Sequence, residues 1–381
     1  MPLPDHLERN LLEIPIPPSS RIDVYSGVAR MSGATWASEV RRRGDRPTTA
    51  LVMIHPTANF LGHYTLPMLA ELGVAGIGMT TRYIANDANL NVENCLLDIG
   101  AAVRTLRARG YERVVLVGNS GGGSIVPYYQ AQAERPSVTT PPGGVGPDLT
   151  AADLPKADAI ILFMAHVSRA RLSMEWLDPA IIDESVPFGR DPGLDAFNPD
   201  NGPPFPREFV ERYRAAQLAR NRRITAWAEQ QLAQLEHERH WPHGLDDLAF
   251  VVHGTSADLR FLDPTIDASD RPSGTTLWGQ TDVANYLPAG IGRYTSLRSW
   301  INQWSVDRSN GNALLWLPKL ETPVLVVGGS ADSGSPPVIL EQLYEAVQTA
   351  RRQYVLVPGA THYFEGQPDL LRQACEAMIA W

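Results

Sequence analysis

The sequence predicts an α/β protein with a mostly parallel β-sheet covered by helices on both faces. Two observations carry this prediction. Short apolar, β-prone runs alternate with helical patterns, as expected for parallel strands buried on both faces. The chain is also long enough, at 381 residues with 44% hydrophobic and 20% charged residues, to bury a large core. The candidate strands span residues 50–55, 74–79, 114–117, 159–164, 324–327 and 354–357.

The segment between the second and third candidate strands predicts a helix. Residues 91–109 carry apolar side chains at a helical period, namely Val92, Cys95, Leu96, Ile99, Val103 and Leu106. Strand, helix and strand here form one βαβ crossover. The Pro-, Gly- and Thr-rich segment 138–155 predicts a surface loop before the strand at 159–164.

The middle of the chain predicts a mainly helical cap. From about His166 to Leu314 the alternation of strands and helices lapses, and a helix from about Arg207 to Glu238 precedes turn-rich sequence. We therefore expect a core of residues 1–165 and 315–381 with a cap of 166–314. Seven tryptophans in or just beyond the cap either fill its own core or line an apolar cavity: Trp176, Trp227, Trp241, Trp278, Trp300, Trp304 and Trp316.

Charge and composition narrow the class of partner. A formal net charge of −9 argues against general nucleic-acid binding, which depends on clustered Lys and Arg, and favours a small-molecule partner. Cys95 and Cys375 are the two cysteines and form no CxxC pair, which argues against a disulfide framework or a Cys-rich zinc site. The N-terminal sequence lacks an apolar signal region and no apolar run approaches the roughly 20 residues that cross a bilayer. The expectation is a cytoplasmic protein without membrane insertion; a homo-oligomer is compatible with the sequence.

A nucleophile elbow is predicted at Ser120. Residues 114–124 read VVLVGNSGGGS, a strand followed by Gly118-x-Ser120-x-Gly122 and an amphipathic stretch. Glycines at these positions make room for a serine on a sharp turn, whose hydroxyl then lies at a helix N-terminus. A plain strand-to-helix turn is the structural alternative. A phosphate-binding loop is disfavoured because the segment has neither a Walker lysine nor the G-x-G-x-x-G spacing.

A base and an acid follow later strands. His362, in the segment GATH after the strand at 354–357, is expected to take the serine proton. Asp332, in VLVVGGSADSGSPP, is expected to orient that histidine. Asp258, in the similar segment FVVHGTSAD, is the alternative acid, although it falls within the predicted cap and could only cap a turn.

The second oxyanion donor is expected in the loop after the first candidate strand. That strand ends His55-Pro56-Thr57-Ala58, and because proline has no N–H, the expected backbone donors are Thr57 and Gly121. His55 is expected to organise the loop. No cofactor and no metal are predicted.

With GNSGG, GGSADSGSPP and GATH in the order Ser, Asp, His, the chain resembles the α/β-hydrolase superfamily over residues 1–165 and 315–381. The resemblance implies an α/β-hydrolase fold and a serine hydrolase that forms an acyl-Ser120 intermediate. A carboxylic ester is the expected substrate, with thioesters and lactones open. The alternatives are a carbon–carbon bond hydrolase of a diketone-like compound and a non-catalytic small-molecule receptor on the same fold.

Three further patterns favour structural roles. His237, His240 and His243 do not match the H-E-x-x-H zinc pattern and are expected at a solvated helix end. The arginines of the helix from 207 are expected on its exposed surface, with a carboxylate-binding role for one of them as the alternative. Arg82-Tyr83 and Asn86-Asp87 follow a strand end and could cap a turn or shape the pocket.

Overall fold

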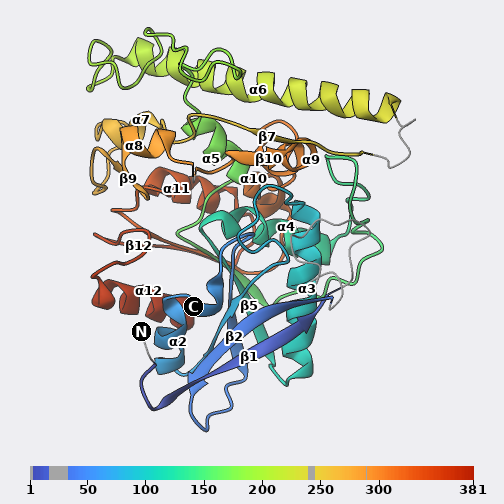
Figure 1. Ribbon diagram of the computed structural model, residues 1–381. Helices are drawn as coiled ribbons and strands as arrows, with labels where there is room; N and C mark the ends of the chain where they lie inside the picture. The colour runs from blue at the N-terminus through green and yellow to red at the C-terminus, as the bar shows by residue number, and fades with distance from the viewer. Residues whose placement is uncertain (1–2, 17–32, 239–244, 289) are drawn as a thin grey trace.

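The computed structural model describes residues 3–16, 33–238, 245–288 and 290–381, and an eight-stranded sheet forms its centre (Figure 1). Its strand order is β1-β2-β4-β3-β5-β6-β11-β12. β2 runs antiparallel to both of its neighbours, and every other pair is parallel. The strands are β1 (Leu7–Pro15), β2 (Ala34–Arg42), β3 (Thr49–Ile54), β4 (Ala75–Met79), β5 (Arg113–Asn119), β6 (Ala159–Phe163), β11 (Val324–Gly329) and β12 (Arg352–Val357).

Helices cover both faces of this sheet. Alternate residues of each strand point to opposite faces, so the sheet supports two separate apolar cores. One core holds α2 (Thr65–Glu71) and α12 (Pro368–Ala380). The other holds α3 (Val92–Ala108), α4 (Val126–Glu134) and α11 (Pro337–Ala346). The predicted fold class, a mostly parallel sheet flanked by helices, is confirmed.

The predicted crossover helix forms because its sequence supplies both a cap and an apolar face. The Asn91 side chain accepts hydrogen bonds from the backbone N–H groups of Glu93 and Asn94 and so begins α3. All six predicted strands are present, with boundaries that differ by a few residues. β1 and β2 were not predicted. Both carry charged or exposed side chains at alternate positions and lie at one side of the sheet, so neither reads as a continuous apolar run.

The segment between β6 and β11 supplies no strand to the main sheet among its described residues. Its elements lie over the carboxyl edge of the sheet, with α6 outermost (Figure 1). The proposed division at residues 166–314 agrees with this arrangement in position but remains a prediction. The elements are α5 (Arg169–Trp176), α6 (Arg207–His237), α7 (Leu259–Leu262), α8 (Thr281–Tyr286), α9 (Leu297–Ser299), the π-helix η3 (Trp300–Trp304), α10 (Ala313–Trp316), the strand pair β7 (Ala249–Val251) and β10 (Tyr294–Ser296), and the strand pair β8 (Thr275–Thr276) and β9 (Gly279–Gln280).

Most of the cap tryptophans are packing residues. Trp300 and Trp304 are buried in a cluster with α6, Trp176 packs edge-to-face on Phe261, and Trp316 stacks on Tyr128 of α4. Trp176, Trp300 and Trp304 thus fill small cores within residues 166–314, as in the first interpretation, whereas Trp316 belongs to the main core beside α4. Trp227 and Trp278 are more exposed, and Trp241 lies outside the described residues.

The arginines of α6 were expected on an exposed surface, but two of them form ion pairs on the side of the helix that faces the protein. Arg220 is buried and pairs with Glu184 at 2.6 Å, and Arg214 pairs with Asp258 at 2.7 Å. These ion pairs hold α6 to the segments that carry Glu184 and Asp258. His237 ends the helix and is exposed as expected, whereas His240 and His243 lie outside the described residues. No helix in the described ranges is long and apolar enough to cross a membrane.

Candidate active site

Ser120 occupies a strained turn at the carboxyl end of β5. Its φ of +52° lies in the left-handed region, which non-glycine residues rarely adopt outside functional turns. The turn continues as the 3-10 helix η2 (Ser120–Ser124) and then α4. A Cβ on Gly122 would stand 1.9 Å from the carbonyl oxygen of Ile54, and one on Gly118 would stand 2.7 Å from the carbonyl oxygen of Gly122. Glycine is therefore required at both places for the turn to pack against β3.

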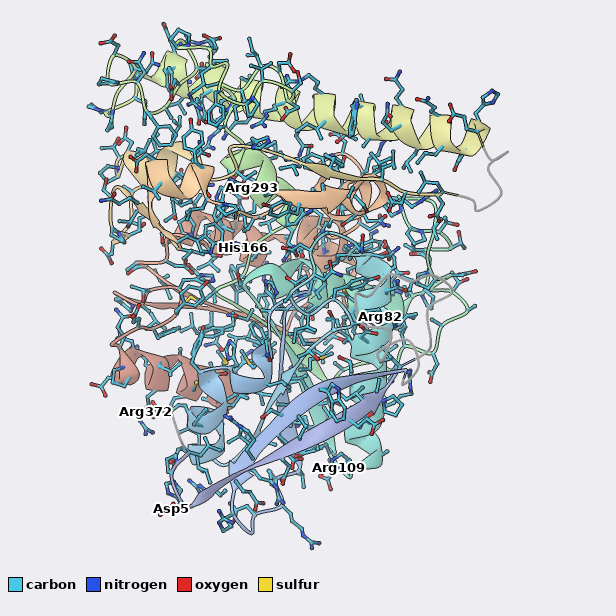
Figure 2. All side chains as sticks on the ribbon, viewed as in Figure 1. Asp5, Arg82, Arg109, His166, Arg293 and Arg372 are labelled. Carbon is cyan, nitrogen blue, oxygen red and sulfur yellow. The ribbon has the colours of Figure 1, made fainter. Side chains whose placement is uncertain are left out.

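The Ser120 hydroxyl lies against His166, a residue that the sequence analysis did not select. Ser120 Oγ is 3.1 Å from His166 Nε2. His166 follows the end of β6, and two backbone hydrogen bonds join the segments, from Ser120 N to the Met164 carbonyl and from His166 N to the Ser120 carbonyl. The position of His166 in the sequence could have indicated this contact, because β6 is parallel to β5 and ends at the same edge of the sheet. Figure 2 places His166 between the sheet and the cap.

His166 is held by a second serine. Its Nδ1 lies 2.8 Å from Ser335 Oγ, and the Ser335 hydroxyl donates to the Met164 carbonyl at 3.2 Å. With its single proton directed to Met164, Ser335 accepts from His166 Nδ1–H, so His166 Nε2 accepts the Ser120 proton. Burial, followed by the charges of His362 and Arg169, lowers the pKa of His166 to about 3. The imidazole is neutral at physiological pH.

Asp332 and His362 form a buried pair. His362 Nδ1 donates to Asp332 Oδ2 at 2.8 Å, and the backbone N–H groups of Gly334 and Ser335 donate to Asp332 Oδ1 at 2.7 and 2.9 Å. Burial raises the pKa of the Asp332 carboxyl, but the His362 ring and the Ser335 N–H outweigh it and hold that pKa below its ordinary value. His362 Nε2 is buried and has no hydrogen-bond partner in the described part of the chain.

The two histidine rings stack beside the serine. Their centroids are 5.9 Å apart with an interplanar angle of 14°. The structure thus brings Asp332 and His362 together and places the Ser120 hydroxyl on His166 rather than on His362.

Ser120 has a positive φ at a strand-to-helix turn, and Asp332 and His362 follow the last two strands of the same sheet. This arrangement is typical of the nucleophile elbow, acid and base of an α/β-hydrolase fold. The strand order of the sheet and this turn give the chain an α/β-hydrolase fold. No protein-family profile and no curated protein sequence matches the chain.

Solved structures similar to this chain include the esterase domain of a Rhodothermus marinus protein, at 13% identity over 98% of this chain and 97% of that chain (TM-score 0.47). Others are a Paleococcus ferrophilus monoacylglycerol lipase, at 14% identity over 91% and 98% (TM-score 0.45), and an esterase of the bacterial hormone-sensitive lipase family, at 14% over 99% and 83% (TM-score 0.45).

The predicted oxyanion loop has an unexpected hydrogen-bond pattern. The N–H groups of Thr57 and Ala58 donate to His55 Nδ1 at 3.1 and 2.9 Å. The Thr57 donor is therefore already engaged within its own loop. A Cβ on Gly121, the other predicted donor, would stand 2.8 Å from His55 Nε2 and 3.0 Å from Arg169 Nη1.

Arg169 is a second residue that the sequence analysis missed at this site. Its guanidinium is buried, pairs with Asp87 at 2.6 Å and stacks over the Trp304 ring at 4.6 Å. Asp87 thereby positions Arg169 beside Gly121, which favours a role of the Asn86-Asp87 segment in shaping the pocket over a role in capping a turn. Arg82, in contrast, pairs with Asp98 of α3 at 2.7 Å.

Asp258, the alternative acid, has a structural role. It is buried, begins α7 by accepting from the Arg260 N–H, and pairs with the guanidinium groups of Arg214 and Arg260. These contacts account for its carboxylate oxygens.

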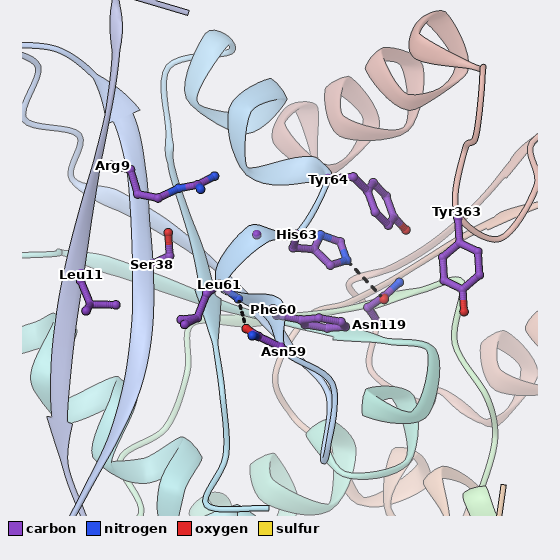
Figure 3. Close-up of a pocket in the computed structure, with 11 residues that line it drawn as sticks. Arg9, Leu11, Ser38, Asn59, Phe60, Leu61, His63, Tyr64, Asn119 and Tyr363 are labelled. Atoms are coloured by element: carbon purple, nitrogen blue, oxygen red, sulfur yellow. Dashed lines mark hydrogen bonds between the residues drawn. The ribbon is translucent and has the colours of Figure 1, made fainter. Parts of the chain in front are cut away.

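A cavity of about 650 Å³ lies beside the chain neighbours of Ser120 and His362 (Figure 3). Asn119 and Tyr363 line it, and Asn119 Oδ1 is 3.4 Å from His63 Nε2. Aromatic and aliphatic side chains form most of the remaining wall, namely Leu11, Phe60, Leu61 and Tyr64, with Arg9, Ser38 and Asn59 at its polar side. Such a cavity suits a small, partly apolar molecule.

Proposed function

We propose that this protein is a serine hydrolase that cleaves a carboxylic ester of a small, partly apolar molecule in the cytoplasm, without a cofactor. The observation that carries the proposal is the strained Ser120 near the His362–Asp332 pair, in which His362 Nε2 has no hydrogen-bond partner among the residues that the structure describes. Buried polar atoms in proteins usually have a hydrogen-bond partner, so the bare lone pair of His362 Nε2 needs an explanation. We infer that the Ser120 hydroxyl becomes its donor during the reaction.

The reaction begins with rotation of the Ser120 hydroxyl from His166 to His362. His362 Nε2 takes the proton as Ser120 Oγ attacks the ester carbonyl, and Asp332 stabilises the imidazolium through Nδ1–H. Collapse of the tetrahedral intermediate breaks the ester bond, and the imidazolium protonates the leaving alkoxide. Water, deprotonated by the same histidine, then releases the acid from acyl-Ser120.

His362 is a better base than His166 for physical reasons. His166 has a pKa of about 3, so it holds a proton poorly, and its Nδ1 faces a hydroxyl instead of a carboxylate. Nδ1 of His362 instead donates to the Asp332 carboxylate, which can stabilise the imidazolium formed when Ser120 gives up its proton. We therefore assign the base to His362 and a resting hydrogen bond to His166.

The test is covalent labelling with a fluorophosphonate, read as intact-protein mass, beside turnover of p-nitrophenyl esters of increasing acyl length. Wild type is expected to gain one phosphonyl group and to release p-nitrophenol. Ser120→Ala is expected to do neither.

Each outcome of that test has a separate meaning. Labelling at Ser120 without turnover of any ester would contradict general ester cleavage. It would favour hydrolysis of a carbon–carbon bond or a substrate narrower than the esters tested. No labelling would overturn the assignment of an activated serine and favour a receptor.

A further inference from the structure

The oxyanion loop contains a side-chain donor aimed at the turn after Ser120. We propose that His55, through its Nε2–H, supplies the second hydrogen bond to the oxyanion in place of the Thr57 backbone. This inference rests on the proposed function, because it concerns the tetrahedral intermediate formed on Ser120. It replaces a backbone oxyanion donor with a side chain.

The tautomer of His55 follows from its hydrogen bonds. Nδ1 accepts two backbone N–H groups, those of Thr57 and Ala58, so this nitrogen carries a lone pair and no proton. In a neutral imidazole the proton then resides on Nε2. Burial, and next the positive charge of Arg169, lowers the pKa of His55 well below its ordinary value and keeps the ring neutral.

The position of Nε2 fits an oxyanion donor. Nε2 lies 2.8 Å from the point where a Gly121 Cβ would be, and the Gly121 amide nitrogen is only two bonds from that point. The imidazole N–H and the amide N–H can therefore reach the same oxygen atom. Nε2 has no hydrogen-bond partner among the described residues, so its proton is available.

The surroundings add to the stabilisation. Arg169 Nη1 lies 3.0 Å from the same Gly121 position and brings positive charge to the place where negative charge develops. Donors that are fixed before reaction need no reorganisation when the oxyanion forms. The two backbone bonds at Nδ1 fix the His55 ring in this way.

Two substitutions separate donation by Nε2 from organisation of the loop. An Asn at position 55 can keep the loop bonds, because Asn91 in this chain already accepts from the N–H groups two and three residues onward. It cannot reach the position of Nε2. His55→Gln, whose longer side chain ends in an amide N–H, restores a donor near Nε2.

His55→Asn is expected to fold with a near-normal Tm and to lose about 10²–10³-fold in kcat, as for removal of one oxyanion donor, with KM changed little. His55→Gln is expected to recover at least part of that loss. His237→Asn, at the exposed end of α6, is the matched control and is expected to match wild type. Wild-type kcat in a folded His55→Asn would overturn the inference.

A complex with an alkylboronic acid keeps the inference testable if His55→Asn fails to fold. One boronate oxygen is expected within hydrogen-bond distance of both His55 Nε2 and Gly121 N in its crystal structure; an oxygen bound by Thr57 N instead would overturn the inference. These results are distinguishable from failure of the proposed function, in which wild type itself neither forms the Ser120 adduct nor reacts with a fluorophosphonate.

Discussion

Two histidines compete for one serine proton in this site. The resting hydroxyl donates to His166, while the nitrogen that we assign as the base has no partner. In the proposed mechanism, rotation about the Ser120 Cα–Cβ bond carries the hydroxyl from His166 to His362. The contact with His166 then holds the hydroxyl until substrate arrives, while His362 Nε2 makes no hydrogen bond to any described residue.

Removing each histidine in turn tests this assignment. His362→Gln is expected to lower kcat by about 10³–10⁴-fold, because His166, the other histidine at the Ser120 hydroxyl, faces the Ser335 hydroxyl instead of a carboxylate. His166→Gln removes only the resting contact and is expected to lower kcat less than about tenfold. Steady-state kinetics on the best p-nitrophenyl ester gives both values, and the opposite ranking would make His166 the base.

The sequence was informative about residues that belong to a motif and silent about those that reach the site only through the fold. Ser120, Asp332 and His362 were selected from strand ends and chain order, and the structure pairs Asp332 with His362. His166 and Arg169 follow β6 without a recognisable pattern. Thr57 was selected because proline has no N–H, but a hydrogen bond to the nearby His55 ring could not be foreseen from composition.

At the scale of elements, the elbow depends on the close approach of η2 to β3. The carbonyl of Ile54 occupies the place that a side chain on Gly122 would need. The glycine thus brings the helix start close to the strand end, and with it Ser120 close to the oxyanion loop.

Gly122→Ala is expected to destabilise the protein by about 1–3 kcal/mol, because its methyl group must displace backbone instead of a flexible side chain. Gly62→Ala is the matched control, since a Cβ there meets no atom within 4 Å and its backbone is not left-handed. Thermal unfolding followed by circular dichroism measures both, and equal Tm values for the two variants would contradict the packing argument.

Six of the eight strands of the main sheet were predicted from the sequence, and β1 and β2 were not. Five of the six predicted strands are buried on both faces, which gives them continuous apolar runs. The sixth, β12, carries an apolar run although it is a largely exposed or half-buried strand at the edge of the sheet. β1 and β2 form an antiparallel pair in which charged residues such as Glu13 and Arg41 alternate with apolar ones. Their pattern is typical of half-exposed strands, which a search for apolar runs misses.

For the whole molecule, buried neutral histidines predict a loss of stability in acid. The pKa values of His63 and His166 are lowered to about 3, chiefly by burial, whereas an unfolded histidine titrates near 6.5. Between these pH values the unfolded chain binds protons that the folded protein does not. The free energy of unfolding therefore falls as pH decreases below about 6.5.

Urea unfolding at pH 7 and pH 5, followed by tryptophan fluorescence, measures this dependence. Between the two pH values wild type is expected to lose about 2 kcal/mol more than His166→Gln, which has one titrating imidazole fewer. Equal losses in the two proteins would show that the pKa of His166 in the folded protein is close to that of an unfolded histidine.

The pairing of β11 with β6 also has a consequence for how the protein is made. Val324 lies opposite Ile160, so the apolar edge of β6 stays unpaired until the ribosome has translated all of residues 164–323. At ordinary elongation rates that interval is on the order of ten seconds, during which an unprotected strand edge can pair with other nascent chains. We expect the yield of native protein to depend on chaperones that bind during translation.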